Sequence, residues 1–163
     1  MKNQTPASFV AQGGVIAALY VALTVAFAPI SFGAVQIRVA EALTILPMFT
    51  PAAVPGLFVG CVIGNVLGGG ILPDIIFGSL ATLIGAALGY KLRRNRWLVP
   101  IPAVLSNTLI IPFVLKYGYM IEDIPLPWMA IYIFAGEVVG CYILGELLAA
   151  PLLRHRNTVF PSE

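Results

Sequence analysis

The residues best suited to chemistry are ionisable side chains inside long apolar segments. Arg38 and Glu41 lie in QIRVAEALTILPMFTPAAVP, residues 36–55, and Glu137 lies in FAGEVVG. A charge is costly to hold in lipid, so an ionisable residue there normally has a partner and a function. We therefore interpret residues 36–55 as part of a membrane-embedded site for a small polar molecule.

Three prolines, Pro47, Pro51 and Pro55, interrupt the same segment. Short, proline-interrupted hydrophobic segments are typical of the binding region of a transporter. Arg38 and Glu41 also stand at i and i+3 of an expected helix, a spacing that allows a mutual ion pair. A purely structural pair is therefore the alternative to a role in binding.

Glu137 is the strongest candidate for a ligand contact. It lies about ten residues, roughly 15 Å, into its expected helix and has no basic residue within one turn. A carboxylate at that depth needs a donor, which a cation or amino group of a ligand would supply. Glu146 lies about half a turn away around the helix. We expect Glu146 to be paired near the cytoplasmic end or used in a subunit contact.

The remaining candidates are amide, carboxylate and aromatic side chains. Asn65 and Asn107 suit ligand contacts or helix–helix hydrogen bonds, and Asp74 suits a ligand contact or a helix cap. The aromatic candidates for stacking on a flat ligand, or for anchoring at the membrane interface, are Phe32, Phe77, Trp128 and Tyr132.

Gly136 and Gly140 form a G-x-x-x-G motif beside Glu137. This motif indicates close helix packing in a membrane.

Motifs for catalysis are absent from the sequence. There is no G-x-x-x-x-G-K-[ST], H-E-x-x-H or G-x-S-x-G, so we expect no ATP hydrolysis, metal-dependent hydrolysis or acyl transfer by this chain. Cys61 and Cys141 lack a C-x-x-C pattern and are interpreted as small packing residues rather than a disulfide. We expect no catalytic residues, no metal and no cofactor.

Composition predicts an all-α integral membrane protein. Of 163 residues, 60% are hydrophobic and 10% charged, whereas soluble domains carry about 25% charge. One transmembrane domain, 1–163, is expected, and the first apolar segment is interpreted as a retained span rather than a signal peptide. The pattern predicts a bundle of six transmembrane helices at 9–29, 37–49, 52–67, 74–92, 98–115 and 128–153, with a loop from Pro29 to Gln36.

The basic residues predict the orientation. The cluster KLRRNR at 91–96 and the tail Arg154–Arg156 should be cytoplasmic. An even number of spans then places Lys2 on the same side, so that both termini are cytoplasmic. The polar candidates would converge on the outer half of the membrane, where a solute could be captured from outside.

Small residues recur every four positions in the first span, at Gly14, Ala18, Ala22 and Ala26. This small-residue ridge allows another helix backbone to approach closely. Internal packing and docking of a separate membrane subunit are the two alternatives.

The segments QIRVAEALTILPMFTPAAVPGLFVGCVIGN, GGG, PDIIFGSLATLIGA and FAGEVVG resemble the QueT family of queuosine-precursor transporters across nearly the whole chain. These are substrate-binding (S) components of energy-coupling factor (ECF) transporters. The resemblance implies a non-enzymatic six-helix subunit of a prokaryotic plasma membrane, whose partners are a transmembrane coupling subunit and two cytoplasmic ATPases. It also implies that the A-x-x-x-A ridge docks on the coupling subunit.

The resemblance further implies a deazapurine cargo, 7-aminomethyl-7-deazaguanine (preQ1) or queuine. A guanine-like edge pairs with a carboxylate, and its O6 needs a donor such as Asn107 or Arg38. An aminomethyl cation needs a second carboxylate or an aromatic face. We favour Glu137 for the edge and leave the second carboxylate open between Asp74 and Glu41. The alternatives are an S component for riboflavin, thiamine or folate, a stand-alone proton-coupled carrier, and a structural scaffold without a ligand.

Overall fold

The computed structural model describes residues 5–31 and 36–155. All regular structure in these residues is helical, with no strand among them. The expected all-α architecture is thus confirmed. The elements in chain order are α1 (Pro6–Ala26), α2 (Ala28–Ser31), η1 (Val39–Met48), α3 (Ala53–Leu67), η2 (Asp74–Gly78), α4 (Ser79–Lys91), η3 (Arg96–Leu98), α5 (Ile101–Phe113), η4 (Val114–Gly118), α6 (Leu126–Glu137), η5 (Val138–Leu144) and α7 (Gly145–Arg154).

Four continuous helices in the described residues are long and apolar enough to cross a membrane, namely Pro6–Ala26, Asp74–Lys91, Arg96–Gly118 and Leu126–Arg154. Two shorter apolar helices, Val39–Met48 and Ala53–Leu67, complete the set. Within the long helices, η2, η4 and η5 are π-helical stretches that continue directly into or out of α-helix. These boundaries lie close to those of the six predicted spans.

The expected loop from Pro29 to Gln36 is wrong at its start. Ala28–Ser31 forms the short helix α2, in which the Ser31 hydroxyl and backbone N–H both donate to the Phe27 carbonyl. Residues 32–35 of that expected loop lie outside the described part of the chain.

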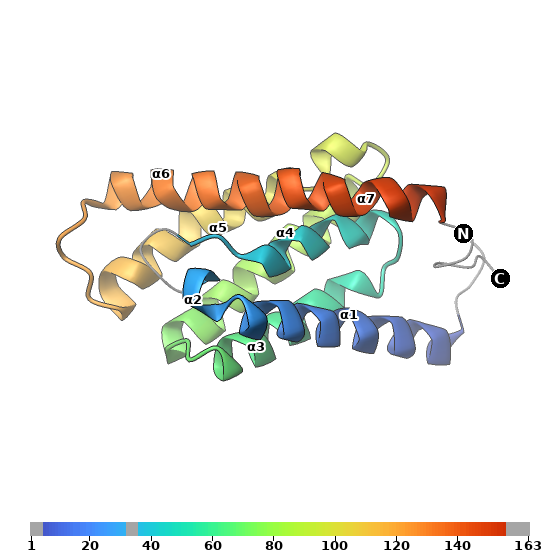
Figure 1. Cartoon of the computed structure of the whole chain (residues 1–163), viewed down its shortest axis with the longest axis horizontal. Helices are drawn as coiled ribbons and strands as arrows, with labels where there is room; N and C mark the ends of the chain where they lie inside the picture. Colours follow the sequence, from blue (N-terminus) through green and yellow to red (C-terminus); the bar gives the residue numbers. More distant parts are fainter. Residues whose placement is uncertain (1–4, 32–35, 156–163) are drawn as a thin grey trace.

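The 3₁₀ helix η1 is the central element of the bundle. It contacts α1, α3, α4, η5 and α7, and every residue from Ala40 to Pro47 is buried. Figure 1 shows it between α1 and the helix formed by α6 and α7. A 3₁₀ helix rises about 2.0 Å per residue, compared with about 1.5 Å in an α-helix. The 3₁₀ form therefore extends this short segment further through the bundle.

The helices lie roughly along one axis (Figure 1). The start of α1 and the end of α7 lie at the same end of the bundle, as does the turn between α4 and α5 that carries the basic cluster. This arrangement brings most of the expected cytoplasmic charge to one end.

Glycines in α3 let α1 approach closely. The position of a Cβ on Gly60 lies 2.7 Å from Tyr20 Cβ and 3.0 Å from the Ala17 backbone. A Cβ on Gly56 would lie 2.8 Å from the Gly13 carbonyl oxygen, and one on Gly64 would lie 3.1 Å from Thr24 Cβ, both on α1. The three glycines stand four residues apart, so they form one flat stripe along the helix.

Gly136 and Gly140 pack against the extended segment before η1. A Cβ on Gly136 would collide with the Gln36 carbonyl oxygen, and one on Gly140 would lie 2.9 Å from the Arg38 carbonyl oxygen. The close packing predicted from G-x-x-x-G is confirmed, although the partner is an extended backbone rather than a helix.

The small-residue ridge of α1 faces outward. Gly14, Ala18, Ala22 and Ala26 are all exposed, and a Cβ on Gly14 would meet no atom within 4 Å. The opposite side of α1 supplies the buried residues. Internal packing of the ridge within the described bundle is therefore excluded.

Gly60→Leu tests the glycine stripe. The added side chain would force α1 and α3 apart, and we expect the free energy of unfolding to fall by about 1–3 kcal/mol, the usual cost of overpacking a core. The measurement is the midpoint of thermal unfolding in detergent. Gly14→Leu, on the outward face, is the matched control and should leave the midpoint unchanged or slightly raised, because leucine favours helix over glycine. Equal midpoints for the two variants would contradict this packing.

Candidate functional site

Six of the polar residues predicted from the sequence lie in the interior, each at most 5% exposed. They come from η1 and the segment before it, and from α3, η2, α5 and α6. These six residues are Arg38, Glu41, Asn65, Asp74, Asn107 and Glu137. Buried polar groups need partners, and the partners that they find separate structural residues from candidate binding residues.

Arg38 forms its ion pair with Asp74. Its Nη2 lies 3.2 Å from both carboxylate oxygens of Asp74, and the Tyr119 hydroxyl donates to Asp74 Oδ2 at 3.2 Å. Two alternatives from the sequence are corrected. Arg38 is paired across the bundle rather than with Glu41, and the Asp74 side chain does not cap its own helix. In an apolar interior the guanidinium is a stronger partner for this carboxylate than backbone N–H groups.

Asn65 supports this pair from α3. Its Nδ2 donates to the backbone carbonyl of Asp74 at 3.3 Å and lies 3.6 Å from Cys61 Sγ. The helix–helix hydrogen bond expected of Asn65 is thus confirmed between α3 and η2.

Glu41 is held by a different partner. The Tyr20 hydroxyl on α1 donates to Glu41 Oε1 at 2.6 Å. The other oxygen, Oε2, is buried and has no hydrogen-bond partner among the described residues. One oxygen of this carboxylate is therefore held by Tyr20, and the other makes no hydrogen bond within the described residues.

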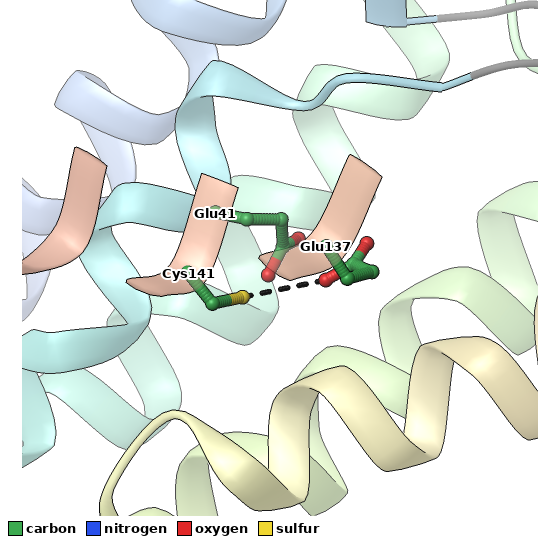
Figure 2. Close-up of side chains that lie close together, drawn as sticks. All are labelled: Glu41, Glu137 and Cys141. Carbon is green, nitrogen blue, oxygen red and sulfur yellow. Dashed lines mark hydrogen bonds between the residues drawn. The ribbon is translucent and has the colours of Figure 1, made fainter. Parts of the chain in front are cut away.

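Glu137 lies beside Glu41. The Cys141 thiol donates to Glu137 Oε2 at 3.3 Å. One carboxylate oxygen each of Glu41 and Glu137 and the Cys141 sulfur lie within 4.8 Å of one another. Figure 2 shows the two carboxyl groups and the thiol directed into the same space. This spacing is also compatible with a shared metal ion, which the sequence did not predict.

Asn107 completes the group from α5. Its amide lies next to Glu137, and both Nδ2 and Oδ1 are buried without a hydrogen-bond partner in the described residues. The neighbouring Ser106, in contrast, donates to the Ala81 carbonyl at 2.9 Å. Asn107 thus offers an amide N–H₂ donor and a carbonyl acceptor beside Glu137.

The charges of this interior do not balance. The buried charged residues of the described part are Arg38, Glu41, Asp74 and Glu137, and Arg38 is committed to Asp74. Glu41 and Glu137 therefore face each other, and no basic side chain among the described residues forms an ion pair with either. Two ionised carboxylates whose oxygens lie within 4.8 Å of each other in an apolar interior require a proton or a cation between them.

The aromatic candidates do not gather at the carboxylates. Phe77 is 50% exposed and lines an outer groove of about 450 Å³ with Phe113 and Tyr117. Trp128 is 54% exposed, and its ring lies 6.3 Å from that of the half-buried Tyr132. Phe32 lies outside the described residues. Phe77 and Trp128 thus lie on the outer surface of the described bundle.

Glu146 is paired, as one alternative predicted. Its Oε2 lies 3.6 Å from Arg96 Nε. Arg96 lies in the turn between α4 and α5, so this bridge ties α7 to the end of the bundle that carries the basic cluster.

Sequence reasoning missed Tyr20, Tyr119 and Cys141. Cys141 is a free, buried thiol, as its role as a packing residue required, but it also donates to Glu137. The two tyrosines donate to carboxylates far away in the sequence. A tyrosine in an apolar helix indicates a hydroxyl that needs a hydrogen-bond acceptor. The sequence does not indicate which residue supplies that acceptor.

Comparisons with known proteins agree on one family. The QueT transporter family matches residues 10–154. A relative from Lactococcus lactis subsp. cremoris (strain MG1363), named "Queuosine precursor transporter QueT", is 38% identical over 80 residues. That alignment covers 48% of this chain and 47% of the relative, so the match spans about half the length of each. No solved structure matches the chain.

The family match covers the first long helix, the central η1 segment and the whole candidate site. The resemblance of the 36–55 segment and of FAGEVVG is thereby confirmed. A transporter family and four long apolar helices together indicate a membrane protein. The chain belongs to the QueT transporter family.

Proposed function

We propose that this chain is the substrate-binding S component of an ECF importer, and that it captures a deazapurine precursor of queuosine, preQ1 or queuine, from outside the cell. A coupling subunit and two ATPases would supply the energy for import. The name of the L. lactis relative supports the substrate class. The observation that carries the proposal is the buried group of Glu41, Glu137 and Asn107, whose charges and hydrogen bonds are incomplete without a ligand.

The available atoms suit a guanine-like heterocycle. Glu137 would accept from the N1–H and N2–H₂ donors of its edge, and Asn107 Nδ2 would donate to its O6. Arg38 is less suited to O6, because it is engaged by Asp74. Tyr132, half-buried one α-helical turn before Gly136, is the best placed of the described aromatic candidates for stacking.

We propose six membrane passes with both termini in the cytoplasm. The four long helices and the two short ones provide these passes. The helix ends near the basic cluster lie together at one end (Figure 1), which the positive-inside rule assigns to the cytoplasm. The plasma membrane of a prokaryote is the expected location.

The outward ridge of α1 would dock on the coupling subunit. Its small residues are exposed although they stand on a helix whose other face packs tightly. Close contact with a helix of a partner would use such a surface.

A proton-coupled carrier is the second candidate, because two carboxylates in close contact can also hold and release a proton. It predicts uptake driven by a pH gradient in vesicles that contain this chain alone. Binding without such uptake favours the S component. An S component for riboflavin, thiamine or folate would be revealed by competition binding with those compounds.

Glu137→Gln tests the site. The loss of a charge-assisted hydrogen bond should weaken binding of preQ1 by roughly 10- to 100-fold, as measured by isothermal titration calorimetry on the purified chain. The thermal midpoint should change little, because glutamine keeps the size and an acceptor for Cys141. Glu146→Gln, a carboxylate paired with Arg96 instead, is the control. Unchanged affinity in Glu137→Gln would show that the site lies elsewhere.

Asp74→Asn tests whether Asp74 is structural. Removal of one partner of a buried ion pair costs about 3–5 kcal/mol, so the thermal midpoint should fall clearly. The double variant Arg38→Gln with Asp74→Asn should recover part of that loss, because no uncompensated charge remains. If Asp74→Asn keeps its stability but loses ligand affinity, Asp74 is a ligand contact instead.

The pair of substitutions Ala18→Trp and Ala22→Trp tests the docking ridge. Two bulky rings on this face should prevent assembly with the coupling subunit and leave preQ1 affinity unchanged. Co-purification of the complex and calorimetry measure the two effects. Leu105→Trp with Leu109→Trp, exposed at the same spacing on α5, should still assemble. Normal assembly of the α1 variant would refute the ridge as the docking face.

A further inference from the structure

The neighbouring carboxylates of Glu41 and Glu137 accept hydrogen bonds from different side chains. Glu137 accepts a hydrogen bond from the Cys141 thiol, and Glu41 accepts one from the Tyr20 hydroxyl. Of these two residues, only Glu41 has a buried carboxylate oxygen without a hydrogen-bond partner in the described part of the chain. An ionised oxygen of this kind demands a cation.

We propose that Glu41 is the receptor for a primary ammonium group carried by the ligand, so that the site selects cationic over neutral deazapurines. This proposal rests on the proposed function and assigns the second carboxylate that the sequence left open. Glu137 binds the heterocycle edge, and Glu41 binds the charge. The ligand cation offsets one of the two buried carboxylates, Glu41 and Glu137, that the Arg38–Asp74 pair leaves without an ion-pair partner in the described residues.

Asp74, the other candidate carboxylate, is not available for this role. Both of its oxygens lie 3.2 Å from Arg38 Nη2, and Oδ2 also receives the Tyr119 hydroxyl. A ligand ammonium at Asp74 would have to displace a buried guanidinium, which is costly. Glu41 needs no such displacement.

Asn107 strengthens the assignment. An ammonium has three N–H donors and no acceptor, and it needs more than one acceptor in a dry site. Asn107 Oδ1 is a buried acceptor without a partner in the described part, and its Nδ2 is a donor in the same state. On a 7-substituted deazaguanine, O6 and the 7-substituent occupy neighbouring positions. One amide can therefore donate to O6 and accept from an ammonium at position 7.

Tyr20 acts as a positioning residue. Its hydroxyl, fixed on the buried face of α1, donates to Glu41 Oε1 at 2.6 Å. This hydrogen bond leaves Oε2 as the free acceptor. α1 therefore contributes to the binding site on one face and presents the small-residue ridge on the other.

An ammonium fits this group better than a metal ion does. A metal would need Cys141 as a thiolate, whereas here the sulfur lies in hydrogen-bond contact with a carboxylate oxygen. Tyr20 also occupies one oxygen of Glu41. Binding of an ammonium leaves both of these hydrogen bonds intact.

The test compares two ligands that differ in charge. Calorimetry on the purified full chain would use 7-aminomethyl-7-deazaguanine, which is cationic, and 7-cyano-7-deazaguanine, which is neutral. The wild type should prefer the amine by roughly 10- to 100-fold, the usual value of a charge-assisted hydrogen bond. Glu41→Gln should lose this preference while its affinity for the cyano compound changes little. Glu146→Gln, the matched control, should keep the full preference.

The outcomes are distinguishable. If the wild type binds neither compound, the proposed function fails. If both compounds bind and Glu41→Gln keeps the preference, this inference is overturned and the proposed function stands. Amine binding that disappears with EDTA would also overturn it, in favour of a metal site.

A second variant covers a failure of Glu41→Gln to fold, which loss of cyano binding would reveal. Tyr20→Phe keeps the Glu41 carboxylate and removes only the hydroxyl that orients it. Its preference for the amine should be reduced but not abolished. A Tyr20→Phe chain that binds the cyano compound and keeps the full wild-type preference would contradict the arrangement.

Discussion

The cost of charge in an apolar interior is the constraint on which this structure depends. Arg38 and Glu41 enter the bundle on the central segment and reach partners on other helices. Arg38 is neutralised by Asp74 of η2, and Glu41 is positioned by Tyr20 of α1. The central segment is thereby joined to helices on two sides. The second oxygen of Glu41 has no hydrogen-bond partner among the described residues, and together with Glu137 it forms the proposed binding site.

The backbone is adapted to bring these charges together. The 3₁₀ form of η1 extends a short buried segment through the bundle, and Gly136 and Gly140 let the chain before it lie directly against α6 and η5. Glu137 immediately precedes the π-helical stretch η5. π-helical turns are frequent at functional sites because they redirect side chains within a helix. Larger residues at the two glycines would push Glu41 away from Glu137.

α1 links binding to assembly through its two faces. One face is buried against the glycine stripe of α3 and presents Tyr20 to Glu41. The other exposes the small-residue ridge. A single helix therefore lies between the proposed ligand site and the proposed docking surface, and a shift of α1 on docking would act directly on the Tyr20–Glu41 hydrogen bond.

The sequence by itself determined the helical membrane class, the approximate helix boundaries and the family, because apolar runs, prolines and short motifs are local features. It also identified Glu137, Asn107 and Glu41 as candidates. Only the tertiary structure decided the partners. Arg38 forms an ion pair with Asp74. Tyr20 donates a hydrogen bond to Glu41, and Cys141 donates one to Glu137. Such choices depend on which helix faces meet across the bundle, and residue spacing along one helix cannot supply that information.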